Sequence, residues 1–151
     1  MSRLSRSDEP LDRLPGDVAA AFIFSDLRPP RGGAALLDWR LNGRLTRMLL
    51  DGEAEGRPGE HILVANNGKL AADWALFIGG GAGPDRLSTS SRKLLSHLLD
   101  VCRRAGFSRL AIGLSAADAA EAAALERTLA ELLAETAAPE LECRLVIDDD
   151  L

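Results

Sequence analysis

Glycine residues gather where a strand-like run gives way to a helix-like run in the stretch FIGGGAGPDRLSTSSRK, residues 77–93. Backbone N–H groups at the start of a helix attract anions, and glycine lets a phosphate approach the backbone closely. The stretch matches neither the G-x-G-x-x-G pattern nor the P-loop pattern. It therefore leaves two interpretations open, a plain turn or a site for a phosphate-bearing small molecule. The candidate ligand contacts are Gly79, Gly80, Gly81, Gly83 and Ser88.

A second glycine pair, Gly32-Gly33, precedes the next helix-like run. Open α/β sheets bind ligands beyond the carboxyl ends of their strands. If both glycine loops follow strand ends, they lie at the same edge, so Gly32 and Gly33 are further candidate ligand contacts.

Three arginines, Arg40, Arg44 and Arg47, recur at helical spacing. Residues three and four apart share one face of a helix. Such a face is either solvated and paired with acids or is used by a partner, and these three residues are the candidate partner surface.

The other reactive side chains do not form a recognisable site in the sequence. His61 and His97 have no carboxylate at the spacing of a metal motif, and Cys102 and Cys143 have no His or Cys at ligand spacing. We expect both cysteines to pack in the core. The acidic run 148–150 reads as a solvated tail, and we expect no metal and no cofactor.

Charge is uneven along the chain. Residues 1–109 carry 16 basic and 13 acidic side chains, whereas residues 110–151 carry 2 basic and 10 acidic ones. Phosphate backbones need positive charge, so the acidic end argues against nucleic-acid binding. The first residues lack the apolar region of a secretory signal, and no apolar run is long enough to span a membrane. We therefore expect a cytoplasmic protein.

Apolar runs and amphipathic runs alternate along most of the chain. The first 16 residues are polar and read as a flexible arm, and residues 17–151 as a single domain. Predicted strands cover 17–26, 61–66, 74–79, 108–114 and 141–148; predicted helices cover 34–52 and 88–105, and a third begins at Ser115.

This alternation predicts an α/β fold in which one sheet lies between two helix layers. The Asn67-Gly68 pair is a strong signal for a tight turn, which would make the sheet mixed rather than wholly parallel. Ser115 and Asp118 approximate a capping box. Alternating exposed and apolar residues in 141–148 predict an exposed or edge strand.

Residues 28–81 resemble the N-terminal domain of the M17 leucyl aminopeptidases. The matching residues are the small opening Gly32-Gly33-Ala34-Ala35, the sequence Leu37-Asp38-Trp39-Arg40, the Gly59-Glu60 loop, the strand through Val64 and the strand ending in glycines. The Asp-Trp-Arg sequence is the most specific of these.

The resemblance implies a macro-domain-like αβα sandwich with a mixed sheet. In that family the zinc ligands and the catalytic lysine and arginine lie in a separate C-terminal domain, to which nothing here corresponds. It thus implies a non-catalytic domain that acts through a protein partner or self-association, in assembly or regulation. The alternative is a module that binds ADP-ribose or a related nucleotide at the glycine loops, and a third is a subunit that works with a separate catalytic chain.

Overall fold

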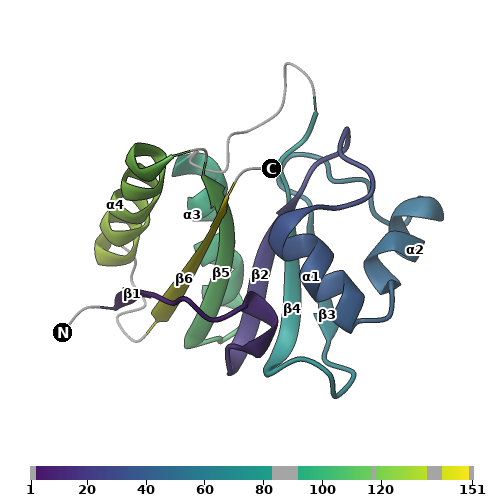
Figure 1. The fold of residues 1–151 in the computed structure, drawn as a ribbon, viewed down its shortest axis with the longest axis horizontal. Coiled ribbons are helices and arrows are strands. Elements are labelled where there is room, and N and C mark those ends of the chain that lie inside the picture. Colours follow the sequence, from purple (N-terminus) through teal and green to yellow (C-terminus); the bar gives the residue numbers. More distant parts are fainter. Residues whose placement is uncertain (1–2, 83–91, 117, 136–140, 150–151) are drawn as a thin grey trace.

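The computed structural model describes residues 3–82, 92–116, 118–135 and 141–149. These residues form one sheet with helices on both of its faces (Figure 1). In chain order the elements are β1 (Leu4–Arg6), the 3-10 helix η1 (Leu11–Arg13), β2 (Gly16–Ile23), α1 (Gly32–Arg40), α2 (Arg44–Leu50), β3 (His61–Ala65), β4 (Ala72–Gly79), α3 (Arg92–Arg104), β5 (Arg109–Ala116), α4 (Ala119–Glu135) and β6 (Glu142–Asp149).

The sheet has six strands in the order β1-β6-β5-β2-β4-β3. All neighbouring pairs are parallel except β3 and β4, which are antiparallel and are joined through the predicted Asn67-Gly68 region. In that connection the Asn66 side chain accepts hydrogen bonds from the N–H groups of Gly68 and Leu70. The predicted mixed sheet is confirmed.

Each face of the sheet buries its own apolar core. Leu76 and Ile112 face α3 and α4, whereas Ala19, Ala75 and Phe77 face η1, α1 and α2. In Figure 1, α1 lies on one side of the strands and α3 on the other. The predicted three-layer sandwich is therefore confirmed. No helix among the residues that the structure describes is both long and apolar enough to cross a bilayer.

The amino-terminal segment is packed, not loose. Leu4 to Arg6 form β1, which pairs with β6, and Leu11 and Leu14 are fully buried against the α1 side of the sheet. The arm predicted for residues 1–16 is thus wrong from Leu4 onward. Its polar composition hid the two buried leucines, of which Leu11 packs beside Gly33 of α1 and Gly113 of β5.

The helix predicted over 34–52 is two helices. Asn42 and Gly43 have φ angles of 58° and 75°, in the left-handed region that ends α1. Gly43 was expected inside a continuous helix, but it supplies the turn between α1 and α2, because glycine adopts a positive φ without strain. Gly52, with φ of 77°, follows the end of α2.

Two further boundaries differ from the prediction. Ser115 belongs to β5, and the N-cap of α4 is Asp118, whose Oδ1 accepts the Glu121 N–H at 2.8 Å. Ser115 therefore does not cap the helix, and the capping box predicted from Ser115 and Asp118 is wrong. Strand β6 lies between β5 and β1, so it is not an edge strand.

One carboxylate joins the starts of two central strands. Asp17 Oδ2 accepts the N–H groups of Ser108 at 2.7 Å and Arg109 at 2.9 Å, and also the Ser108 hydroxyl. These donors, first the Ser108 amide, hold the pKa of Asp17 below its usual value. The ionised form thus stabilises the alignment of β2 with β5.

Candidate functional site

The parallel strands β2, β4, β5 and β6 all end at the same edge of the sheet, where both glycine loops lie. Gly79 ends β4, and Gly32 and Gly33 begin α1. The structure thus brings these predicted contacts to one edge. Gly83 and Ser88 lie outside the described residues.

The glycines after β4 use their amides within the chain. The N–H of Gly79 donates to Glu60 O at 2.7 Å, that of Gly80 to Ile23 O at 2.8 Å, and that of Gly81 to Gly56 O at 2.8 Å. These three donors are therefore not available to a phosphate.

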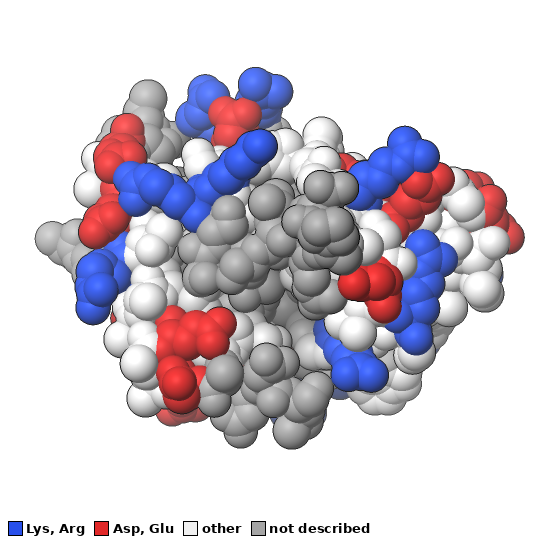
Figure 2. All heavy atoms as spheres, turned by 90° about the horizontal axis from the view of Figure 1, so that it is seen from above, with Lys and Arg blue, Asp and Glu red and all other residues white. Residues whose placement is uncertain are grey.

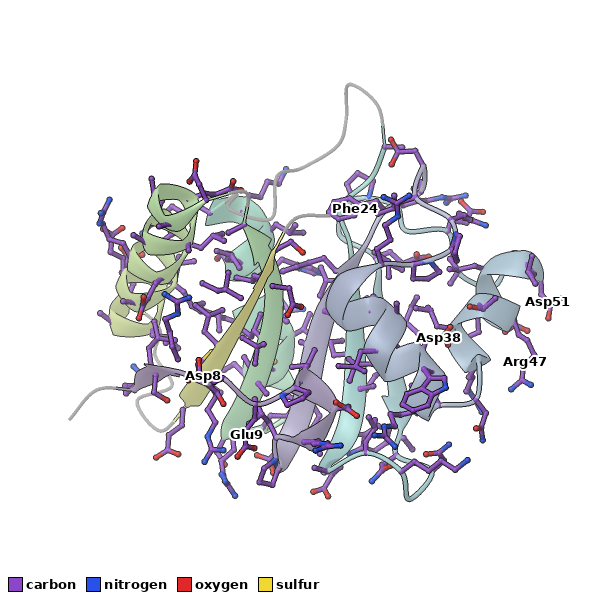
Figure 3. All side chains as sticks on the ribbon, in the orientation of Figure 1. Asp8, Glu9, Phe24, Asp38, Arg47 and Asp51 are labelled. Atoms are coloured by element: carbon purple, nitrogen blue, oxygen red, sulfur yellow. The ribbon has the colours of Figure 1, made fainter. Side chains whose placement is uncertain are left out.

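Close packing explains why glycine is needed at two of these positions. A Cβ on Gly79 would lie 2.0 Å from the Arg57 carbonyl oxygen, and one on Gly80 would lie 2.2 Å from the ring of Phe24. Figure 3 shows Phe24 at the carboxyl edge of the sheet. The glycine run lets the loop around Arg57 and the Phe24 ring cover the end of β4.

The Gly32-Gly33 loop is the more open of the two. A Cβ on Gly32 would lie 3.5 Å from Ser115 Oγ, and one on Gly33 would lie 3.0 Å from Leu11 Cδ2 and 3.6 Å from Gly113 Cα. Gly33 thus allows α1 to approach β5 closely. The N-cap residue Arg31 makes no side-chain hydrogen bond to the first turn of α1. This helix end is accordingly the candidate anion site that the geometry leaves open.

A cavity of about 340 Å³ adjoins α1 at Leu36. It lies beside the segment that crosses the sheet between β1 and η1, on which Figure 3 labels Asp8 and Glu9. Its lining combines apolar and charged side chains: Arg6, Ser7, Asp8, Glu9, Pro10, Leu11, Leu36, Val146, Ile147 and Asp148. Leu11 connects it to the glycine loop, because the same side chain packs beneath Gly33.

The three predicted partner arginines do not form one stripe. Arg40 belongs to α1, and its Nε donates to the buried carboxylate of Asp12 at 2.6 Å while its guanidinium stacks on Trp39 at 4.6 Å. Arg44 and Arg47 lie on α2 and are exposed, and Arg47 points away from the body of the molecule in Figure 3. Arg40 is therefore a structural residue, and only the α2 pair remains free for a partner.

Asp38 holds the two helices together. Its Oδ1 accepts the Leu45 N–H at 2.8 Å and the Thr46 N–H at 3.4 Å, and its Oδ2 accepts the Thr46 hydroxyl at 2.5 Å. The Asp38 side chain is buried between α1 and α2 (Figure 3). A residue of α1 thus caps α2, which explains the acid in the Asp-Trp-Arg sequence.

Large apolar side chains lie at the β3 end of the molecule. Trp39 of α1 is 67% exposed and Leu50 of α2 is 77% exposed. Leu63 of β3 and Trp74 of β4 are less exposed, but they are diagonal neighbours on one face of the sheet, because Ala65 pairs with Trp74. The last two therefore form a continuous apolar surface.

The described part of the chain contains no group of three or more His, Cys, Asp or Glu side chains that could hold a metal ion. Burial raises the pKa of the Cys102 thiol to about 12, and burial raises the pKa of Cys143 as well. Both thiols therefore stay protonated and act as core side chains. Figure 2 looks onto the carboxyl edge and shows Lys and Arg interspersed with Asp and Glu among the described residues, with no single cationic surface.

The sequence matches the model of the N-terminal domain of the cytosol aminopeptidase family over residues 22–138. The chain belongs to this family. No curated protein matches it. The predicted likeness to the M17 N-terminal domain is confirmed.

Solved structures place this M17 N-terminal domain in the macrodomain fold. A tomato leucine aminopeptidase variant matches with a TM-score of 0.64 and 17% identity, over 96% of this chain and 32% of that chain. The macrodomain of Mycobacterium tuberculosis DarG matches with a TM-score of 0.70 and 13% identity, over 95% and 96% of the two chains. The macrodomain of Thermus aquaticus DarG gives 0.67 and 10%, over 96% and 97%. The chain spans about a third of the tomato enzyme.

Sequence reasoning missed the residues that organise this M17 N-terminal domain. Asp12, Asp17 and Asp38 each hold together elements that are distant in sequence or separated by a turn. The Asp38 and Leu45 spacing of seven residues gave no capping signal, because a cap is expected directly before its helix. Residues 1–16 were expected to form a flexible arm, and nothing in their sequence marked Asp12 as buried.

Proposed function

We propose that this M17 N-terminal domain acts by binding another protein, in assembly or regulation, and does not itself catalyse a reaction. The observation that carries the proposal is the apolar surface of Leu63 and Trp74 at the β3 end of the sheet. Exposed apolar side chains that lie together favour an interface, whereas isolated ones need no explanation. The glycine run at the end of β4 does not support ligand binding, because its N–H groups already donate to backbone oxygens within the domain.

The test compares the wild-type domain with the Leu63→Lys, Trp74→Lys double variant, both tagged and expressed at native level. Light scattering measures self-association, and affinity capture with quantitative mass spectrometry measures partners. We expect one association that the wild type makes and the double variant loses, while both proteins keep the same circular dichroism. A wild type that stays monomeric and captures nothing beyond the tag control contradicts the proposal.

A second candidate function is binding of ADP-ribose or a related nucleotide. The cavity beside α1 supports it, because Leu11, Leu36 and Val146 give the cavity an apolar lining and Leu11 also packs beneath Gly33 at the start of α1. Flat calorimetric titrations with ADP-ribose and common nucleotides at millimolar concentration would remove this candidate. If they show binding, Leu36→Trp, which fills the cavity, should abolish it.

A further inference from the structure

The helix layer formed by α3 and α4 stops before the last strand of the sheet. Leu76 of β4 is buried in the α3–α4 core, but no residue of β3 belongs to that core in the described chain. The register pairs Leu63 with Leu76 and Ala65 with Trp74, so Leu63 and Ala65 face the same side as α3. Both remain exposed. Among the residues that the structure describes, this face of β3 therefore lies beside α3 without a helix over it.

The flank of α3 that faces β3 is basic. The ring of His97 lies 5.6 Å from the ring of His61, so the His97 side of α3 is the side that faces β3. Lys93 is four residues before His97, Val101 is four residues after it, and Arg104 is seven residues after it. These spacings place all three on the same side of α3 as His97. Lys93 and Arg104 are exposed, whereas Val101 packs against the core. We call these residues, with Leu63, Ala65 and Trp74, the α3–β3 surface.

One carboxylate lies close to this flank. Asp100 accepts from Arg103 at 2.6 Å and from Arg104 at 3.1 Å, so two cations share a single anion. The sheet part of the surface holds no Lys, Arg, Asp or Glu, because His61, Leu63, Ala65 and Trp74 make up its described side chains on this face. The surface is thus apolar on its floor and positive on its wall.

The opposite flank of α3 shows which kind of helix packs against a basic side of α3. There Arg92 donates to Glu131 at 3.0 Å and to Glu135 at 2.6 Å, both on α4. Helix α4 buries a leucine face on the sheet and carries its glutamates outward or toward α3. An acidic amphipathic helix therefore already packs on one side of α3.

We propose that an acidic amphipathic helix of a partner protein packs on the α3–β3 surface. It would extend the layer as α4 does, with its apolar face on Leu63 and Trp74 and its carboxylates toward Lys93 and Arg104. A helix is about 10 Å wide and strands are about 4.8 Å apart, so one helix suits the width of β3 and the outer part of β4. This inference rests on the proposed protein-binding function and names the chemistry of the partner.

The test uses two designed peptides of about 18 residues. Both place leucine at helical i, i+3, i+4 and i+7 spacing; one carries glutamate on its flank and the other lysine. Amide chemical shifts of the labelled domain report where and how tightly each binds. We expect the glutamate peptide to shift amides of β3 and α3 and to bind about fivefold or more tightly than the lysine peptide, with the difference reduced by salt.

Three variants locate the contact. Lys93→Glu should weaken binding of the glutamate peptide and strengthen binding of the lysine peptide. A loss of folding could not change the two affinities in opposite directions. Leu63→Ser should weaken both peptides. The matched control Leu50→Ser removes an exposed leucine on α2 and should change neither.

Equal binding of the two peptides, shifts confined to other elements, or no shifts at millimolar peptide would overturn the proposal. Self-association that occupies β3 and α3 would overturn it too, because the occupant would then be a second copy. In that case, or if capture finds a partner on another surface, the protein-binding function stands while this inference falls.

Discussion

Replacing Asp38 by alanine would test whether one buried carboxylate joins α1 to α2. The side chain accepts the Leu45 N–H, the Thr46 N–H and the Thr46 hydroxyl, and its own exposure is 7%. Alanine offers no acceptor. The first turn of α2 would then lose its cap, and the Leu45 N–H would stay buried without a partner.

The expected loss of unfolding free energy is about 3 kcal/mol. Removing an N-cap costs roughly 1 kcal/mol, and leaving a buried donor unsatisfied costs roughly 1–3 kcal/mol. For a domain of this size, that loss lowers the melting temperature by roughly 6–12 °C. Asp38→Asn keeps one acceptor oxygen but loses the charge, so we expect about half the effect.

Urea unfolding followed by circular dichroism measures both variants. The control is Asp51→Ala, which removes an exposed carboxylate from the C-cap of α2, the helix that Asp38 caps at its start. Its effect should stay within about 0.5 kcal/mol. The reasoning is refuted if Asp38→Ala changes stability no more than Asp51→Ala does, or if Asp38→Asn is as damaging as alanine.

Three other outcomes follow from the packing and charges. Because hydrogen bonds lower the pKa of Asp17, its contribution to the free energy of unfolding should be fully present above its unfolded pKa of about 4 and should disappear as pH falls through the lower folded value. Asp17→Asn should therefore reduce the free energy of unfolding by about 1 kcal/mol near neutral pH and change it little in acid. Urea titrations across this pH range measure the difference. Gly79→Ala should destabilise by about 2–3 kcal/mol, because its Cβ would lie 2.0 Å from the backbone oxygen of Arg57; a change under about 0.5 kcal/mol in thermal melts would contradict the packing. Cys102 and Cys143 should react with a thiol reagent only at the rate of unfolding, so fast labelling of the native protein would disprove their burial.

Local patterns were sufficient for the layers and the mixed sheet. Alternating apolar runs and amphipathic runs predicted the strands β2 to β6 and three helical regions, and Asn67-Gly68 predicted the β3–β4 connection. Each of these signals can be read within a short stretch of sequence, because hydrophobic periodicity and turn preference depend only on neighbouring residues. The likeness to the M17 N-terminal domain came from the same local level, above all from Asp38-Trp39-Arg40.

The chain's own sequence thus determined which segments are strands and helices, and that they stack as a sandwich of the M17 N-terminal type. The tertiary structure alone decided how the predicted site residues are used. It pairs Arg40 with Asp12, it directs the amides of Gly79 to Gly81 into the molecule, and it splits one predicted helix at Gly43. It also places β1 beside β6 and, in the described part of the chain, leaves one face of β3 outside the α3–α4 core. The physical reason is that hydrogen bonds and burial between distant segments depend on which helices and strands pack together. Sequence patterns over a few residues do not specify that packing.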